Sequence, residues 1–358
     1  MKKIVLTGGG TAGHVTPNIA LLPALQAAGY EIAYVGSYEG IEKKLIADFN
    51  IPYTGISTGK FRRYLDPKNF SDPFRVMKGF VEARNYLKNY QPDVVFSKGG
   101  FVSVPVVRAA ASLHIPCIIH ESDMTPGLAN KLCIPVAEKV CCNFPETMKN
   151  IPADKAVLTG SPIRAELAEG SKLAGLNMCG FTANKPVILG IGGSLGAANV
   201  NKAVRDALPK LLEDFQVVHL CGKDKIDNLL LNTPGYKQFE YIKAELKDIF
   251  AMADVVISRA GANAICELLA LKKPNILIPL PAASSRGDQL LNAASFEAQG
   301  YSIVLNEDDI TTNLLVDKVH ELYFNRQNYV DAMSKSHQMD AVKTIMELIN
   351  AAADKKTN

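Results

Sequence analysis

The sequence of 358 residues contains no tryptophan and no long apolar run. The best candidate for a membrane span, residues 101–113, is interrupted by Arg108 and is shorter than the ~18 residues that a spanning helix needs. The chain reaches Gly8 too early for the apolar core of a signal peptide. Its seven cysteines include no Cys-x-x-Cys pair, which indicates reduced core cysteines in the cytosol. We therefore expect neither a transmembrane segment nor a secretory leader.

Several ligand-binding motifs are also missing. No glycine-rich turn continues to Gly-Lys-Ser/Thr, which excludes a phosphate-binding P-loop. No His/Asp cluster accompanies His120, and the chain lacks the Asp-x-Asp with which many sugar transferases hold a divalent ion, so we expect no metal. The net charge of +3 is too small for general affinity for nucleic acid. The length and the hydrophobic content of 47% instead predict an ordinary globular protein with two domains.

Two glycine-rich turns, half a chain apart, are the most informative feature that is present. The first, Thr7–His14, follows the apolar run Ile4–Leu6, and the second, Gly190–Gly196, follows Val187–Leu189. A buried strand that leads through glycines into a helix directs backbone N–H groups at anions. The repetition predicts two similar α/β domains.

Short apolar runs alternate with helical patterns along both halves of the chain. Such alternation, with strands apolar throughout, is typical of a parallel sheet covered on both faces. The expected strands are 3–7, 31–36, 93–97, 116–120, 138–142 and 156–159, then 186–191, 216–221, 238–241, 254–258, 275–279 and 302–305. The expected helices are 17–29, 39–48, 73–90 and 102–113, then 196–212, 245–252, 262–271, 287–299 and 311–325, with a helical tail from residue 340. The link between the halves is expected around residues 160–166.

The first turn matches the dinucleotide fingerprint Gly-x-Gly-x-x-Gly but lacks its other half. That fingerprint needs an acid at the end of the second strand, and here no acid follows Ser37 before Glu39. A nicotinamide-dependent enzyme is therefore disfavoured. His14 ends the turn, where a helix N-terminus favours neutral imidazole that can act as a base. The alternative interpretation is an ordinary core or capping histidine.

Four further segments follow strands, at the edge where open α/β sheets bind ligands. They are Ser97–Ser103, His120–Asp123, Ser258–Glu267 and Arg286–Asn292. Each alone is compatible with ordinary loop chemistry, but their shared position favours a ligand site. Glu267 could accept hydrogen bonds from two ribose hydroxyls.

Residues 60–90 contain eight basic and three acidic residues, and apolar side chains lie among them at helical spacing. One interpretation is a core-facing helix with a solvated basic face. The other is an interfacial surface that meets anionic lipid. The residues concerned are Phe61, Arg62, Arg63, Tyr64, Phe70, Phe74, Arg75, Met77, Lys78, Phe80, Val81 and Lys88.

Together these segments resemble the MurG family, the UDP-N-acetylglucosamine–undecaprenyl-pyrophosphoryl-muramoylpentapeptide N-acetylglucosaminyltransferases of peptidoglycan synthesis. The matching segments follow the family's order: Thr7–His14, Gly99–Val102, His120–Glu121 with Pro126–Leu128, Gly160–Arg164, Gly192–Gly196, Ser258–Glu267 and Asp288–Asn292. The resemblance implies an α/β fold of two Rossmann-like domains with an interdomain cleft, the GT-B architecture. It implies an acceptor and membrane domain at 1–163, a UDP-GlcNAc domain at 164–339, and a C-terminal helix at 340–358 that packs back on the first domain.

The resemblance also implies donor-binding residues and no cofactor. Arg164 and Ser194 would contact the phosphates, Ile242 the uracil, and Glu267 the ribose. Further positions along the donor would be Thr11, Ala12, Gly13, Asp123, Ala262, Asn263, Ala264, Ile265, Cys266, Asp288 and Gln289. Ala12 and Leu195 replace a glycine and a glutamine of the family. Asp123 replaces an asparagine, and a diphosphate would repel its carboxylate unless the group is protonated or turned away.

The implied reaction is inverting transfer of GlcNAc from UDP-GlcNAc to the muramoyl C4 hydroxyl of lipid I, which gives lipid II and supports cell shape and division. His14 is the first candidate base and Glu121 the second. The implied partners are UDP-GlcNAc, lipid I and an anionic membrane surface on the cytoplasmic face of the cell membrane, with other cell-wall synthesis proteins as further candidates. A transferase for another lipid such as diacylglycerol and a UDP-GlcNAc epimerase are the alternatives.

Overall fold

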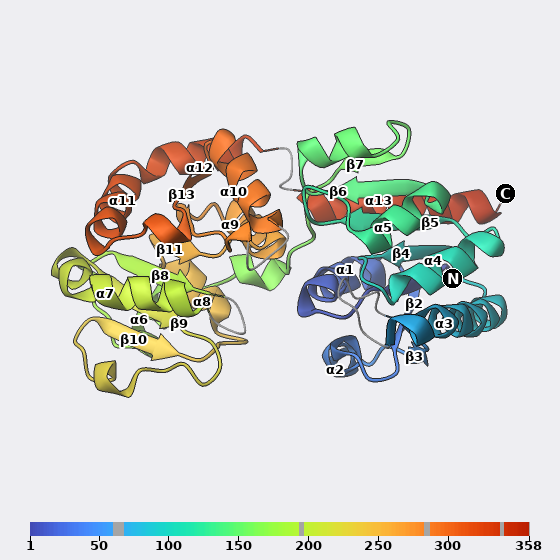
Figure 1. Ribbon diagram of the computed structural model, residues 1–358, viewed down its shortest axis with the longest axis horizontal. Coiled ribbons are helices and arrows are strands. Elements are labelled where there is room, and N and C mark those ends of the chain that lie inside the picture. The colour runs from blue at the N-terminus through green and yellow to red at the C-terminus, as the bar shows by residue number, and fades with distance from the viewer. Residues whose placement is uncertain (60–67, 193–196, 283–286, 337–339, 358) are drawn as a thin grey trace. The chain divides into compact units, whose positions relative to one another are not determined.

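The computed structural model describes residues 1–59, 68–192, 197–282, 287–336 and 340–357. The chain divides into two compact units, unit 1 (Met1–Arg164 with Asp340–Asn358) and unit 2 (Ala165–Met339). Each unit contains one parallel sheet flanked by helices (Figure 1). The prediction of two parallel α/β domains is therefore confirmed.

The sheet of unit 1 has seven strands in the order β3-β2-β1-β4-β5-β6-β7. The strands are β1 (Lys3–Thr7), β2 (Glu31–Ser37), β3 (Tyr53–Ile56), β4 (Val94–Ser97), β5 (Cys117–Glu121), β6 (Lys139–Cys142) and β7 (Ala156–Leu158). The helices are α1 (Thr16–Ala27), α2 (Ile41–Ile46), α3 (Lys68–Tyr90), α4 (Ser103–Ser112), α5 (Leu128–Cys133) and α13 (Ala341–Thr357).

Both faces of this sheet are buried, because successive side chains of a strand point to opposite faces. Ile4 and Leu6 of β1 belong to the core under α1 and α13. Val5, between them, belongs to the core under α3 and α4. The last helix of the chain thus packs on the sheet of unit 1, through Ile345 and Ile349.

Unit 2 repeats the arrangement with six strands in the order β10-β9-β8-β11-β12-β13. The strands are β8 (Val187–Ile191), β9 (Gln216–Leu220), β10 (Tyr236–Phe239), β11 (Val255–Ser258), β12 (Asn275–Leu277) and β13 (Ser302–Val304). The helices are α6 (Lys172–Cys179), α7 (Ala198–Asp214), α8 (Leu246–Met252), α9 (Ala262–Ala270), α10 (Asp288–Ala298), α11 (Thr312–Phe324) and α12 (Arg326–Ser334).

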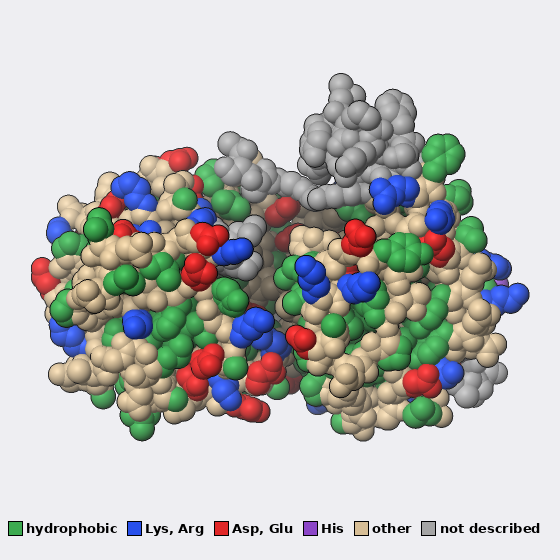
Figure 2. Space-filling model, turned by 90° about the horizontal axis from the view of Figure 1, so that it is seen from below, with side chains coloured by type: hydrophobic (Ala, Val, Ile, Leu, Met, Phe, Trp, Pro, Cys, Tyr) green, Lys and Arg blue, Asp and Glu red, His purple; other side chains and the backbone are tan. Residues whose placement is uncertain are grey.

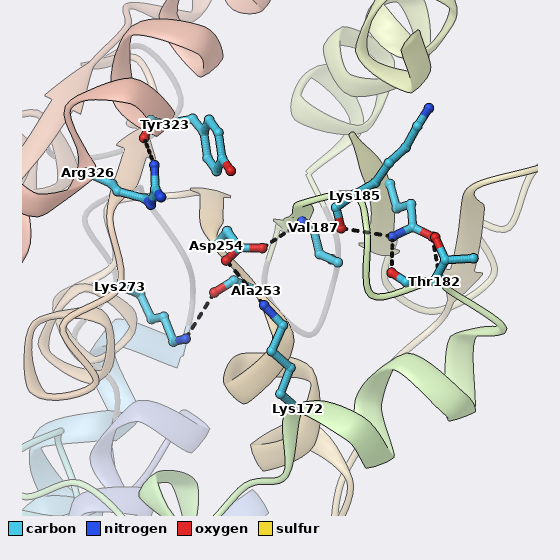
Figure 3. Close-up of polar contacts among 10 residues, drawn as sticks. Lys172, Thr182, Lys185, Val187, Ala253, Asp254, Lys273, Tyr323 and Arg326 are labelled. Carbon is cyan, nitrogen blue, oxygen red and sulfur yellow. Dashed lines mark hydrogen bonds and ion pairs between the residues drawn. The ribbon is translucent and has the colours of Figure 1, made fainter. Parts of the chain in front are cut away.

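In both sheets an aspartate carboxylate binds the first strand at the edge where the strands begin. In unit 1 the carboxylate of Asp93 accepts a hydrogen bond from the backbone N–H of Lys3 (2.7 Å). In unit 2 the carboxylate of Asp254 accepts from the N–H of Val187 (2.9 Å) and lies 3.5 Å from Nζ of Lys172 (Figure 3). In each unit an aspartate just before the fourth strand in sequence therefore ties that strand to the first.

The sequence located most elements but missed four. The short edge strand β3, which contains Gly55, was not expected, nor were α5, α6 and α12. Helix α3 begins five residues earlier than expected. All seven cysteines are buried and none forms a disulfide. Among the residues described, no helix combines the length and apolar character that crossing a bilayer requires.

Candidate functional site

Three loops meet at the carboxyl edge of the sheet in unit 1. The N–H of Gly9, after β1, donates to the carbonyl of Gly99, after β4 (3.3 Å). Gly100 has φ +84°, and a Cβ atom there would collide with the carbonyl oxygen of Gly9. A Cβ atom on Gly99 would lie 3.4 Å from the amide of Asn130, which belongs to the loop and helix after β5. Gly100 is therefore needed because backbone passes directly against backbone, and Gly99 because its φ is +96°.

A buried carboxylate lies against the first glycine turn. Glu42 of α2 is fully buried, and its Oε2 accepts from the N–H of Gly10 (3.2 Å). Its Oε1 accepts from the N–H and the hydroxyl of Ser37 (2.9 and 2.5 Å). A Cβ atom on Gly9 would lie only 2.5 Å from Cδ of this carboxylate. The chain thus supplies its own anion to a turn that was expected to bind a ligand's anion. Glu42 was not among the residues predicted from the sequence.

The predicted residues Thr11, Ala12, Gly13 and His14 form a partly exposed rim between β1 and α1. The hydroxyl of Thr11 lies 3.0 Å from Nδ1 of His14, which orients the ring. Val15, the next residue, is completely buried and anchors the rim to the core. His14 is therefore accessible to a ligand while its position is fixed.

Glu121, the second candidate base, is buried at the end of β5 with 4% of its surface exposed. Its carboxylate accepts from the N–H groups of Asp123 and Gly127 (3.0 Å each) and from the amide of Asn130 (2.8 Å). Burial raises the pKa of Glu121, and these hydrogen bonds oppose the rise. The carbonyl of Asp123 accepts from the hydroxyl of Thr147 (3.2 Å), so Asp123 is held through its backbone on both sides.

A buried polar chain runs beneath these loops. Nζ of Lys98, which is 1% exposed, lies 2.9 Å from Nδ1 of His120, and Nε2 of His120 lies 2.9 Å from the carbonyl of Gly160. Burial and the Lys98 ammonium lower the pKa of His120 well below its usual range. Neutral His120 can therefore accept from Lys98 and donate to Gly160. These hydrogen bonds fix the start of the Gly160–Arg164 segment, whose last residue, Arg164, is the last residue of unit 1 before the chain enters unit 2.

In unit 2 the predicted donor residues on α9 divide into two sets. Asn263, Ala264 and Glu267 are partly exposed. Ala262, Ile265 and Cys266 are buried, with 8%, 0% and 5% of their surface exposed. Ile242, which follows β10, is partly exposed. Ser194 and Leu195 lie outside the described residues.

Helix α10 carries the other predicted donor residues and is attached to neighbouring loops. Asp288 and Gln289 form its first turn, after Gly287 with φ +79°. Oε1 of Gln289 accepts from the N–H of Leu280 (3.1 Å), and the amide of Asn292 donates to the carbonyl of Ala260 (3.3 Å). The structure thus brings residues 260–267 and 288–292 together. No group of three or more His, Cys, Asp or Glu side chains suited to a metal ion occurs within the part of the chain that is described.

Known proteins resemble this chain in both of its units. Residues 4–142 match the glycosyltransferase family 28 N-terminal domain, and residues 187–349 match the family 28 C-terminal domain. A protein of Lachnospira eligens, named UDP-N-acetylglucosamine–N-acetylmuramyl-(pentapeptide) pyrophosphoryl-undecaprenol N-acetylglucosamine transferase, is 65% identical over 98% of this chain and 99% of its own.

Solved structures give the same result for the fold. The crystal structure of Acinetobacter baumannii MurG matches with a TM-score of 0.76 and 28% identity, over 98% of this chain and 100% of that one. A UDP-GlcNAc 2-epimerase of Neisseria meningitidis matches with a TM-score of 0.64 and 13% identity, over 98% and 100% of the two chains. At that identity the second match shows a shared fold alone.

Proposed function

Because the chain belongs to the MurG family of glycosyltransferases, we propose that it transfers N-acetylglucosamine from UDP-GlcNAc to N-acetylmuramyl-(pentapeptide) pyrophosphoryl-undecaprenol. The observation that carries this proposal is the 65% identity, along 98% of the chain, to a relative with that name. The acceptor is lipid I and the product is lipid II, so the reaction belongs to peptidoglycan synthesis. The fold alone would not separate a transferase from an epimerase.

The transfer inverts the configuration at the anomeric carbon of the donor. The muramoyl C4 hydroxyl attacks that carbon, the bond to the diphosphate breaks, and UDP leaves with an added negative charge. The reaction therefore needs a base at the hydroxyl and positive potential at the leaving group. We assign the positive potential at the leaving group to Arg164 and to the helix N-terminus that follows β8. We assign the ribose contact to Glu267, and the sugar contacts to Asp288 and Gln289.

We assign the role of base to His14. If Nδ1–H donates to the Thr11 hydroxyl, the lone pair is on Nε2, the atom that would receive the acceptor's proton. Glu121 suits this role less well. Its oxygens accept three hydrogen bonds from its own loop, which instead makes it a positioning residue for residues 121–130.

The test is transfer of radiolabelled GlcNAc from UDP-GlcNAc to a short-chain lipid I analogue. His14→Ala should lower kcat by about 10²–10⁴-fold, the usual contribution of a general base. Exposed His114, with φ +56°, provides the control, because His114→Asn suits that backbone conformation and should leave kcat unchanged. Near-normal turnover of His14→Ala at saturating substrates would remove His14 as the base.

The same assay separates the alternatives. Transfer to diacylglycerol but not to the lipid I analogue would indicate a different lipid acceptor. Formation of UDP-ManNAc from UDP-GlcNAc without any acceptor would indicate an epimerase.

We also propose peripheral attachment to an anionic membrane surface through α3. Phe80, Ala83 and Leu87 face the core, which agrees with the core-helix interpretation for one face. Three apolar side chains of α3 are nevertheless exposed by 78%, 65% and 51%, namely Phe74, Met77 and Val81. Their spacing places them on one side of the helix, beside exposed Arg75 and Lys78. Hydrophobic and basic side chains also lie next to one another on the surface drawn in Figure 2.

Vesicle sedimentation tests this attachment. Each basic residue near an anionic surface contributes about 1 kcal/mol, so Arg75→Gln with Lys78→Gln should weaken binding to phosphatidylglycerol vesicles about tenfold or more. Lys202→Gln, at an exposed position of α7, is the charge-matched control for one substitution. Unchanged vesicle binding of the double variant would return α3 to an ordinary surface helix. Arg62 and Arg63 lie outside the described residues.

A further inference from the structure

A nearly buried ion pair in unit 2 connects loops that follow three neighbouring strands. Arg259 follows β11, and Glu307 lies in the short turn Glu307–Asp309 after β13. Their side chains form an ion pair and are only 10% and 8% exposed. The guanidinium also donates through Nη1 to the carbonyls of Ile278 (3.0 Å) and Pro279 (3.2 Å), just after β12.

The pair also reaches the helix that follows the second glycine turn. Oε1 of Glu307 accepts a hydrogen bond from the amide of Asn199 (2.6 Å). Asn199 is the second residue of α7, the helix that follows β8 and that turn. Since β8, β11, β12 and β13 are adjacent in the sheet, one ion pair ties together the chain segments after all four strands.

These segments carry the predicted donor residues. The segment after β11 continues into α9 with Glu267, and the segment after β12 leads to α10 with Asp288 and Gln289. Both charges of the pair have partners within the unit, because Arg259 faces Glu307 and two carbonyls, and Glu307 faces Arg259 and Asn199. An effect of the pair on a ligand would therefore pass through the loops.

We propose that Arg259 and Glu307 are positioning residues for the nucleoside diphosphate of the donor. The pair sets the spacing between the first turns of α7 and α9 and the segment after β12, so that all three meet the ligand at once. This inference rests on the proposed donor site in unit 2.

The test separates positioning from stability with a double variant, Arg259→Met with Glu307→Leu. Replacing a whole buried ion pair by apolar side chains is often neutral for stability, whereas removing one partner leaves an unpaired buried charge. We expect the double variant to melt within a few degrees of the wild type. Its Kd for UDP and its KM for UDP-GlcNAc should rise about tenfold, or about 1.4 kcal/mol, with the KM for lipid I analogue unchanged.

The matched control is the ion pair at the opposite edge of the same sheet. Figure 3 shows Lys172 beside Asp254. Nζ of Lys172 lies 3.5 Å from Oδ1 of Asp254. Lys172→Met removes one partner there and should leave UDP binding unchanged. A similar loss of UDP affinity in this variant would mean that any change in the unit weakens binding, which would overturn the proposed role.

The other outcomes are also decisive. If the wild-type protein does not bind UDP, the proposed donor site fails and the inference fails with it. If the wild type binds and the double variant binds equally well, only the inference fails. If Glu307→Gln binds UDP more tightly, Arg259 is a phosphate ligand restrained by Glu307, which also overturns the positioning role.

A second variant applies if the double variant does not fold. Asn199→Ala removes the hydrogen bond from exposed Asn199 to Glu307 and should weaken UDP binding about threefold. An unchanged Kd would refute the inference.

Discussion

The buried carboxylate of Glu42 should hold the first glycine turn in place, and two substitutions of different severity test this. Glu42→Gln preserves the size of the side chain but replaces one oxygen by an NH₂ group. That group must then face the N–H of Gly10 or the N–H of Ser37, which now donate to the carboxylate. Glu42→Ala removes every one of these contacts.

The expected magnitudes follow from the number of hydrogen bonds. A hydrogen bond to a charged group contributes about 1.5–3 kcal/mol, so the glutamine variant should lose about 2 kcal/mol of unfolding free energy. The alanine variant loses the acceptor for two backbone N–H groups and one hydroxyl, and we expect a loss of about 4 kcal/mol, because water can recover part of the total. For a unit of this size these losses correspond to about 4–8 °C and 8–16 °C in Tm.

Thermal unfolding and hydrogen exchange provide the measurement. Amide exchange should accelerate in peptides that contain Gly8–Thr11 and Gly36–Gly40 and should not change in unit 2. Asp48→Asn is the control, since it removes an exposed carboxylate just after the same helix. A Glu42→Ala protein with an unchanged Tm and unchanged exchange at Gly10 would refute the argument.

Three further predictions concern sterics, pH and metal. Gly100→Ala should destabilise unit 1 by more than about 2 kcal/mol, because Cβ would meet the Gly9 carbonyl, whereas Gly29→Ala, with φ +74° and open space, should cost only about 1–2 kcal/mol. Burial, aided by the Arg205 cation, lowers the pKa of His219 from 6.5 to about 3. Between these two pH values the unfolded chain binds one more proton at this histidine than the folded chain does. The free energy of unfolding should therefore fall from pH 6.5 toward pH 3 by up to about 1.4 kcal/mol per pH unit. In His219→Asn, the free energy measured by urea unfolding should depend less steeply on pH. GlcNAc transfer should continue at an unchanged rate with EDTA; a loss restored by Mg²⁺ would show a metal requirement.

The sequence predicts the fold well where a local pattern has one physical solution. The run Ile4-Val5-Leu6 is apolar at every position, and the structure buries alternate residues in two different cores. That property alone excludes a half-exposed antiparallel strand and indicates helices on both faces. The same fully apolar run precedes each of the two glycine turns, and this repetition was sufficient to predict two units.

Residues whose role arises only on folding leave no local pattern in the sequence. Glu42 lies in a short helix after β2, and its contact with Gly10 spans 32 residues of chain. Arg259 and Glu307 are farther apart, and each looks like an ordinary charged loop residue in the sequence. Ile265 shows a different limit, because the family resemblance names this position but does not reveal that the residue is fully buried.

The two units differ in the charge at the matching position after their second strands. Both units use a buried asparagine of the first crossover helix: Asn18 donates to the carbonyl of Thr7 (3.1 Å) and Asn201 to that of Cys221 (2.8 Å). In unit 1 the position five residues after β2 is Glu42, whose carboxylate already occupies the N–H of Gly10. The position five residues after β9 is Lys225, of opposite charge. A carboxylate beside a turn repels a diphosphate, whereas an ammonium group attracts one, so this difference in charge supports the proposal that unit 2 binds the nucleotide.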